Sequence, residues 1–443
     1  RHARGAISSI QKPFNYISIM IIPEEFNDIR PYEPEELPAV YDRLVQNPQF
    51  LQMVSFLFPE ATPEIISQKM HECKTNMDFQ LVFAYRFLKK LISKASTGLD
   101  MDVTAIDNKH NYTFMSNHRD IVLDSALLDV LLIDHGFETT CEIAIGDNLL
   151  SIPWVLDVVR LNKSFIVKRG LMARERLQAS QKLARYMHFA ISEKHQNLWI
   201  AQREGRAKDS DDRTQKGILK MLVLGGEGDV LDRLVNLHIV PLAISYEYDP
   251  CDFLKAQEYQ LKRDDPNWKK GPYDDIISMR TGILGLKGKI HYHVAACIDD
   301  YLNGLREQKL SKSDLLDTIC THIDHEIHRN YRLYTEDDVR KFKLYIQSQL
   351  AKIKIPNKDE EFLRERLLTM YANPARNYIE AVRHGPATAG GRCAVVGCCL
   401  PCWDQTAPVL SAAHPASDRH DREESAVPFH IQVALRQPGC RLR

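Results

Sequence analysis

The sequence predicts an α/β fold in which helices flank a mostly parallel, layered sheet, with further helical sections before and after it. Short runs rich in β-branched and aromatic residues alternate with longer helical runs between residues 97 and 334, as expected of a parallel sheet with crossover helices. Before this region, and again after it, apolar residues recur at helical spacing.

The N-terminal section, residues 1–96, is predicted to be helical. Its apolar residues stand three or four positions apart, as at Phe87, Leu88 and Leu91. This spacing places them on one face of a helix, which can then pack against another element.

The central section, residues 97–334, is predicted to be the α/β domain. Its candidate strands are 112–116, 142–145, 164–167, 198–202, 239–245 and 291–298. Its candidate helices are 121–134, 152–160, 171–192 and 214–235. Helices between consecutive strands are the connections that parallel strands require.

Residues 335–385 are predicted to be C-terminal helices, and the character of the sequence changes after them. The tail, residues 386–443, is rich in Ala, Pro, Gly, His and Cys and has no sustained periodicity. Its clustered cysteines, Cys398, Cys399 and Cys402, lack the second ligand pair of a structural zinc site. We therefore predict a non-native or disordered tail, and we predict no metal site.

Composition narrows the possible functions. The 443 residues are 44% hydrophobic and 26% charged, with 58 Lys and Arg against 59 Asp and Glu. This is ordinary globular usage, and it argues against a disordered chain and against a nucleic-acid-binding partner. No apolar run reaches the roughly 18 residues that span a bilayer. The cysteines before residue 385 are scattered, so we expect a reduced, cytoplasmic protein that is soluble or lies on a membrane surface.

The first segment with candidate catalytic residues is FMSNHRDIVLD. In it, His118 follows a predicted strand and Asp124 stands near the start of a predicted helix. Sites in α/β folds lie at the carboxyl ends of strands. A carboxylate can accept the Nδ1 proton of a histidine and leave Nε2 free to act as a base toward a hydroxyl. The alternatives are a capping or core histidine and a carboxylate that only stabilises a helix N-terminus.

Cationic side chains follow two further predicted strands. Lys168 and Arg169 follow strand 164–167, and Glu204-Gly205-Arg206 follows strand 198–202. Each group precedes a predicted helix, so cationic side chains and a helix N-terminus could bind a phosphate together. A solvated basic helix face is the alternative. Two such strand ends favour an anionic substrate.

Three other features have simpler interpretations. Pro241 in IVPLAISYE lacks an N–H group, which favours a bulge or an edge position. The run LGGEGD at 224–229 lacks the spacing of a dinucleotide loop and is predicted to be a turn. His322, His325 and His328 do not match HExxH and are predicted to lie on a polar helix face.

In this order, the four blocks around His118, Arg169, Arg206 and Pro241 resemble the glycerophosphate acyltransferase superfamily, which includes glycerol-3-phosphate and lysophosphatidate acyltransferases. The resemblance covers roughly residues 100–300, and the flanking helical sections look like the larger glycerol-3-phosphate type. It implies that His118 is the general base and Asp124 its orienting carboxylate. The substrate-binding residues that it implies are Arg119, Lys168, Arg169, Glu204, Gly205, Arg206 and Pro241.

The sequence departs from the family pattern in two places. Five residues separate His118 from Asp124 where the family has four, so that Leu123 occupies the expected carboxylate position. We still predict that Asp124, and not Asp120, bonds to His118, because a helix start can shift by one residue. The Thr or Ser that usually follows the Glu-Gly pair is also absent.

The resemblance implies an enzyme that moves a fatty acyl group from acyl-CoA or acyl carrier protein to a hydroxyl of glycerol-3-phosphate in phospholipid biosynthesis. It implies no cofactor and a peripheral position on the cytoplasmic face of a membrane. The alternatives are transfer to lysophosphatidate or another lyso-lipid, and a catalytically silent lipid-binding homologue. The sequence has no G-x-S-x-G elbow, which counts against an α/β-hydrolase.

Overall fold

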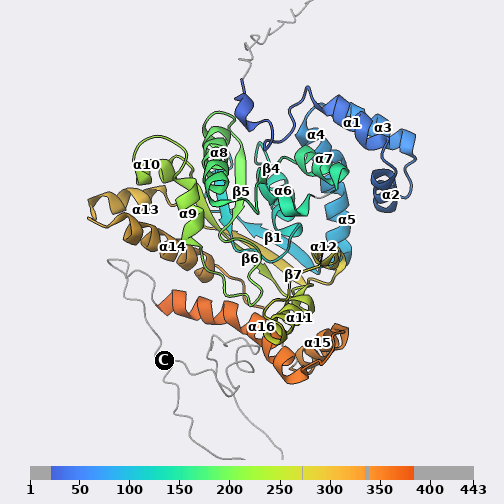
Figure 1. Ribbon diagram of the computed structural model, residues 1–443, viewed down its shortest axis with the longest axis vertical. Helices are drawn as coiled ribbons and strands as arrows, with labels where there is room; N and C mark the ends of the chain where they lie inside the picture. Colours follow the sequence, from blue (N-terminus) through green and yellow to red (C-terminus); the bar gives the residue numbers. More distant parts are fainter. Residues whose placement is uncertain (1–20, 151, 272, 335–338, 384–443) are drawn as a thin grey trace, which may run out of the picture.

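The computed structural model describes residues 21–150, 152–271, 273–334 and 339–383. Predictions for residues 1–20 and for the tail from residue 386 lie outside the described residues. A single sheet lies at the centre, the first helices lie at one end of the molecule, and the last two helices lie at the other (Figure 1).

The sheet has seven strands in the order β1-β7-β6-β2-β5-β3-β4. They are β1 (Gly98–Asp102), β2 (Thr113–Ser116), β3 (Cys141–Gly146), β4 (Ser164–Val167), β5 (Asn197–Ala201), β6 (Ile239–Tyr246) and β7 (Lys289–Val294). Neighbouring strands are parallel except β6 and β7. The predicted α/β class with a mostly parallel sheet is confirmed. The sequence patterns missed β1, and the last predicted strand ends at 294 and not at 298.

The N-terminal section is helical, as predicted. Its helices are α1 (Leu37–Val45), α2 (Pro48–Leu57), α3 (Pro63–Glu72), α4 (Asn76–Phe79), a π-helical turn η2 (Gln80–Tyr85) and α5 (Arg86–Ala95). The side chains of Asn47 and Thr62 accept hydrogen bonds from the first turns of α2 and α3. In both helices a proline follows the cap, where its fixed φ suits the first helical position.

The central helices cover both faces of the sheet. They are α6 (Leu123–Asp134), α7 (Pro153–Leu161), α8 (Ala173–Ser192), α9 (Lys216–Leu222), α10 (Val230–Val235), α11 (Asp252–Asp264), α12 (Asp274–Leu284), α13 (Asp299–Gly304) and α14 (Lys312–Arg329). The predicted helix 214–235 is two helices, because Gly226 and Gly228 adopt φ values of +72° and +82° between them. The predicted turn at 224–229 is thereby confirmed.

Successive side chains of each strand point to opposite faces, and both faces are buried. Met115 of β2 packs with residues of α8, α9 and α14, whereas Phe114 packs with residues of α5 and α6. This explains why the strand sequences are short apolar runs and do not alternate between apolar and polar residues. The last helices, α15 (Val339–Lys352) and α16 (Glu360–Arg383), form a smaller cluster with Ala256 of α11.

Pro241 corrects one expectation. It lies in β6, an interior strand, and its Cα is in register with that of Met115 in β2. The carbonyl of Pro241 accepts the N–H of Ala295, just beyond the last residue of β7. The missing proline N–H therefore faces the end of the β6–β7 ladder, where no further pairing is lost, and neither a bulge nor an edge position is needed.

Among the described helices, none combines the length and the apolar character needed to cross a membrane.

Candidate active site

The carboxyl ends of β2, β5, β3 and β4 lie along one edge of the sheet. These four strands are neighbours and all run parallel. The residues that follow them include His118 after β2, the segment 202–206 after β5 and Lys168 after β4. The sequence blocks chosen for their chemistry are therefore brought to the same edge of the sheet, as parallel pairing requires.

His118 and Asp124 form a hydrogen-bonded pair at this edge. The Nδ1 atom of His118 lies 2.8 Å from Oδ2 of Asp124, and the Asp124 side chain is buried. The same Oδ2 accepts the backbone N–H groups of Arg119 at 2.6 Å and of Asp120 at 3.0 Å. Because an ionised carboxylate only accepts, Nδ1 carries the proton and Nε2 is left as an acceptor. The prediction that Asp124 contacts His118 is confirmed.

Asp120 instead stabilises the turn before α6. This turn explains the five-residue spacing between His118 and Asp124. Its Oδ1 accepts the backbone N–H groups of Val122 at 2.9 Å and of Leu123 at 2.8 Å. The first of these bonds closes an Asx turn, which holds the extra residue before α6 starts at Leu123. A Cβ atom added at Gly282 of α12 would lie 1.9 Å from Oδ2 of Asp120. The turn is therefore packed tightly from outside as well.

A tryptophan fixes the other side of the histidine ring. The Trp199 ring of β5 meets the His118 ring edge-on, with centroids 5.6 Å apart. Its Nε1 donates to Oγ of Ser116 at 3.0 Å. Trp199 is in register with Phe114 and so reaches the end of β2 from the neighbouring strand. The sequence analysis did not single out this residue, although an aromatic residue two positions before a strand end was a usable signal.

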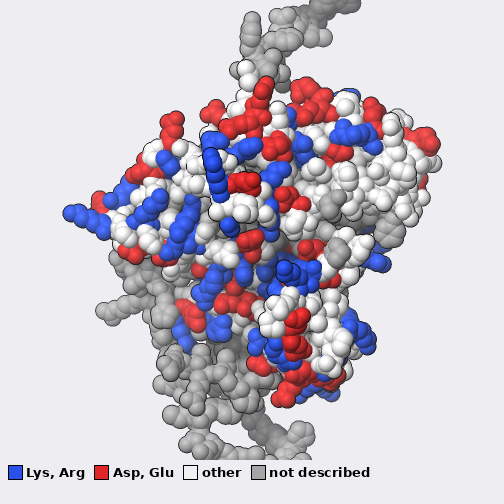
Figure 2. All heavy atoms as spheres, in the orientation of Figure 1, with Lys and Arg blue, Asp and Glu red and all other residues white. Residues whose placement is uncertain are grey.

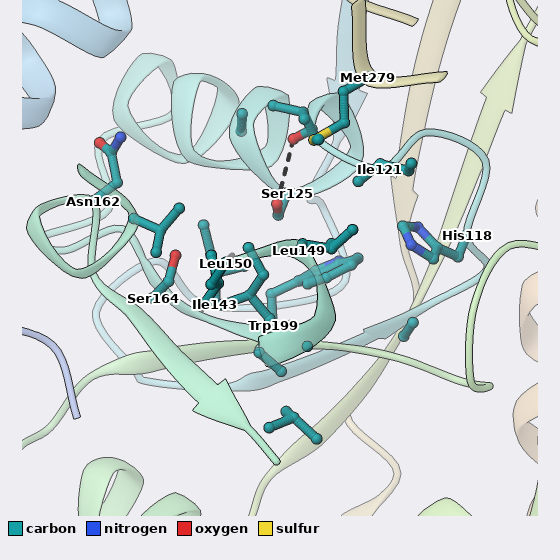
Figure 3. A pocket seen from close by; sticks show the side chains of 18 of the residues that line it. His118, Ile121, Ser125, Ile143, Leu149, Leu150, Asn162, Ser164, Trp199 and Met279 are labelled. Carbon is teal, nitrogen blue, oxygen red and sulfur yellow. Dashed lines mark hydrogen bonds between the residues drawn. The ribbon is translucent and has the colours of Figure 1, made fainter. Parts of the chain in front are cut away.

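A large cavity of about 1240 Å³ opens beside His118. Figure 3 shows His118 near one end and Asn162 near the other, with Ile143, Leu149 and Leu150 between them. Further apolar lining comes from the N-terminal helices and from α6, through Phe50, Met53, Val54, Phe83, Ala126 and Val130. The cavity is therefore a largely apolar space with His118 at one end.

Cations gather along the exposed part of the same lining. We call the exposed residues Lys168, Arg169, Arg176, Lys262 and Lys270 the cationic rim. Glu204, Gly205 and Arg206 also line the cavity, and Nη1 of Arg169 lies 3.5 Å from Oε1 of Glu204. The cation-bearing segments that follow β4 and β5 are thus brought together, although β4 and β5 are separated in the sheet by β3.

A family model described as Acyltransferase matches residues 100–245. The matched segment runs from β1 into β6 and contains His118, Asp124 and both cation-bearing strand ends. Residues 100–245 are therefore similar to an acyltransferase domain. The match confirms the family resemblance that the sequence blocks indicated.

Comparisons outside the family model add two findings. Among solved structures, the chain is similar to the 1-acyl-sn-glycerophosphate (LPA) acyltransferase PlsC from Thermotoga maritima, with 13% sequence identity and a TM-score of 0.30. That similarity covers 66% of this chain and 95% of the other chain. No curated protein matched the sequence.

Two of the predicted substrate-binding residues lie away from the cavity of the acyltransferase domain. The guanidinium of Arg119 is buried and pairs with Asp212, with Nη2 and Oδ2 2.7 Å apart. Pro241 is inside the sheet, and neither residue is part of the cavity lining. Arg119 therefore supports the loop around His118 from beneath and does not face the space where a substrate would bind.

Asp212 joins several segments beneath the loop that carries His118. Besides Arg119, its Oδ2 accepts the Tyr331 hydroxyl at 2.5 Å and the side-chain amide of Asn117 at 3.4 Å. Its carbonyl accepts Nε2–H of His328 at 2.6 Å. The prediction of a polar helix face is therefore wrong for His328, which is buried and lies on α14 where that helix meets this loop.

Two arginines in the segment after β5 have buried nitrogen atoms without hydrogen-bond partners. Nε of Arg203 and Nη1 of Arg206 make no hydrogen bond within the described residues. Both residues line the cavity of the acyltransferase domain. Unpaired cationic donors are costly when they are removed from water, so an anionic ligand beside them would be stabilised.

Burial shifts the pKa of two further cavity residues. It lowers the pKa of Lys208 to about 8 in spite of the adjacent Glu258 carboxylate. It raises the pKa of Asp129 to about 7. Asp129 lies one and a half turns beyond Asp124 on α6, where it accepts the backbone N–H of Cys141 at 2.8 Å. These groups were not predicted, because their burial depends on the packed cavity.

One group of side chains elsewhere has metal-binding donors. Ligand atoms of His238, Cys297 and Asp299 lie within 4.8 Å of one another. Nδ1 of His238 is 2.6 Å from Oδ2 of Asp299, so an ion pair already links two of them. The group lies at the start of β6, at the opposite edge of the sheet from His118, and outside the cavity lining.

Proposed function

We propose that this protein transfers a fatty acyl group from a thioester, acyl-CoA or acyl carrier protein, to a hydroxyl of glycerol-3-phosphate in phospholipid biosynthesis. The observation that carries the proposal is the His118–Asp124 pair at 2.8 Å beside a large apolar cavity with a cationic rim. The acyltransferase domain over residues 100–245 supports the reaction class.

In the proposed reaction, Nε2 of His118 accepts the proton of the acceptor hydroxyl while the hydroxyl oxygen attacks the thioester carbonyl carbon. Asp124 stabilises the imidazolium that forms. When the tetrahedral intermediate collapses, the carbon–sulfur bond breaks and the thiolate takes the proton from the imidazolium. The products are an ester and a free thiol. This sequence needs no metal and no cofactor beyond the thioester donor.

The two ends of the cavity suit the two parts of the substrates. The apolar lining between Ile143 and Phe83 can accommodate a fatty acyl chain. Arg169 and Arg206 can form charge-assisted hydrogen bonds to the acceptor phosphate. On this proposal, the protein works as a peripheral enzyme at the cytoplasmic face of a membrane, where a lipid product can leave.

The test is the release of free coenzyme A from a long-chain acyl-CoA, followed with a thiol reagent. We expect release that depends on glycerol-3-phosphate and is abolished in His118→Ala. His110→Ala is the matched control, because His110 is an exposed histidine before β2. Release that requires lysophosphatidate would assign the alternative acceptor. A folded protein that releases no free thiol from acyl-CoA or from acyl-loaded acyl carrier protein with any acceptor would contradict the enzymatic proposal.

A further inference from the structure

One helix beside the cavity has an exposed apolar face. Exposed apolar side chains follow one side of α12 and the turn after it: Tyr273, Ile276, Ile277, Leu284 and Leu286, of which Ile277 is 48% exposed and Leu286 58% exposed. We call these five residues the α12 surface. Contiguous apolar surface of this kind is uncommon on a soluble protein and marks an interaction site.

The opposite side of α12 is packed against the acyltransferase domain. Gly282 lies against Asp120 of the turn that precedes α6, and Ser278 is buried. Met279 and Asp275 of the same helix line the cavity. The α12 surface is therefore held firmly, on a helix that also contributes to the cavity lining.

A second segment of the lining has the same chemistry. At the start of α8, Met172 is 76% exposed and Leu177 is also exposed. Around them stand Lys168, Arg169 and Arg176 of the cationic rim. Two segments that are about 100 residues apart in sequence thus present exposed apolar side chains and cations beside one cavity.

The first turn of α12 carries Asp274 and Asp275, of which Asp275 pairs with Lys270, but two cations beside the α12 surface have no such carboxylate partner. Lys269 and Arg280 are exposed and form no ion pair within the described ranges. Lys and Arg side chains gather near α11 and α12 on the face drawn in Figure 2. Clustered cations near apolar side chains are typical of segments that bind anionic lipid headgroups.

Arg280 helps to distinguish a lipid surface from a protein partner. It stands within the apolar stripe, between Ile277 and Leu284. The centre of a protein–protein interface is depleted of charged residues. At a bilayer surface, an arginine can extend its charge to the headgroups while its neighbours enter the apolar layer.

We propose that the α12 surface docks onto an anionic lipid bilayer and thereby places the cavity entrance against the membrane. The inference rests on the proposed function in one respect: it assumes that the cavity takes a lipid-like chain. In this arrangement, a product with an acyl chain passes between cavity and bilayer without crossing water.

The first test is sedimentation of the full chain with vesicles of phosphatidylcholine alone or with added phosphatidylglycerol. We expect binding to the anionic vesicles and at least tenfold weaker binding for Ile276→Asp/Ile277→Asp. Leu344→Asp is the matched control, because Leu344 of α15 is 64% exposed but belongs neither to the α12 surface nor to the cavity lining. Equal binding of wild type and the double variant would overturn the proposal.

A second measurement reports insertion directly. Tryptophan fluorescence of Ile277→Trp should shift to the blue and be quenched by brominated lipids when anionic vesicles are added, whereas Leu344→Trp should not respond. An unchanged spectrum at Ile277→Trp would also overturn the docking surface. If the double variant weakens binding of acyl carrier protein but not of vesicles, the surface serves a protein, and the lipid assignment is wrong.

Activity toward water-soluble short-chain acyl-CoA separates this inference from the proposed function. The Ile276→Asp/Ile277→Asp variant should retain that activity, because neither side chain is part of the cavity lining. A wild-type protein that turns over soluble substrates but does not bind vesicles would leave the function standing and refute the docking surface.

Discussion

The contacts around Asp124 predict an unusual difference between two of its substitutions. Its Oδ2 receives three donors, from His118 and from the backbone N–H groups of Arg119 and Asp120, whereas its Oδ1 is buried and has no partner. In Asp124→Asn, the amide oxygen can take the place of Oδ2, because only an oxygen can satisfy three donors. The amide nitrogen would then occupy the Oδ1 position, and the tautomer of His118 would be kept.

Asp124→Asn therefore removes only the negative charge that stabilises the imidazolium. The difference between a charge-assisted and a neutral hydrogen bond at this site is about 1 to 1.5 kcal/mol, or roughly a 5- to 13-fold loss in kcat. Asp124→Ala loses the orientation of His118 as well and leaves two buried N–H groups unpaired. It should fall to the level of His118→Ala, a loss of roughly 10² to 10⁴-fold.

The assay is coenzyme A release at saturating substrates, with circular dichroism to verify folding. Asp120→Asn is the matched control: its amide oxygen can still accept from Val122 and Leu123, so activity should stay within a few-fold of wild type. The reasoning is refuted if Asp124→Asn is as inactive as His118→Ala, or if Asp120→Asn loses as much activity as Asp124→Asn.

Three further predictions concern the cations, pH and packing. Arg169→Ala and Arg206→Ala should each raise the acceptor KM by roughly 30- to 150-fold and leave the donor KM unchanged; the reverse pattern in steady-state kinetics would place the carrier's phosphates at these arginines. Burial raises the pKa of Asp129 from 3.8 to about 7, so between these two pH values the folded state retains a proton that the unfolded state loses. The free energy of unfolding should therefore fall as pH rises from about 4 to about 7, by at most about 4 kcal/mol. Urea unfolding should show a flatter pH profile for Asp129→Asn, and an unchanged profile would contradict the assignment. Gly282→Ala should lower the Tm by a few degrees, because its Cβ meets Asp120 at 1.9 Å; a thermal scan that shows no decrease would mean that α12 moves freely.

The sequence was sufficient where local pattern and chain order determine the result. The run before His118 is short, apolar and followed by polar residues, so both β2 and its functional end could be predicted. Asp124 could be chosen over Asp120 because a carboxylate two residues away cannot reach back to the ring. Neighbouring parallel strands then required the cation-bearing ends to meet at one edge.

The remaining features depend on contacts between distant segments. Arg119 has the charge of a phosphate ligand, and only the position of Asp212 shows that it is used as a buried ion pair. Trp199 could be recognised as an aromatic residue near a strand end, but only the pairing of β5 with β2 shows that it meets the His118 ring. Pro241 suggested an edge strand, because the sequence around it does not show that β7 ends opposite this proline. The exposed face of α12 has no periodic signal that distinguishes it from a buried face.

The contacts that support the loop around His118 have a consequence for how the protein folds. Asn117 bonds Ile244 from 127 residues away, Lys255 bonds the carbonyl of Arg119 from 136 residues away, and Tyr331 reaches Asp212 across 119 residues. Contacts of such long sequence separation form late, because closing each loop costs entropy before the contact is gained. During synthesis, His118 therefore stays without its full set of supports until the chain has been made beyond residue 331. A fragment that ends at residue 245 would contain His118 and Asp124 but lack several residues that support their loop from outside, among them Lys255, Tyr292 and Tyr331.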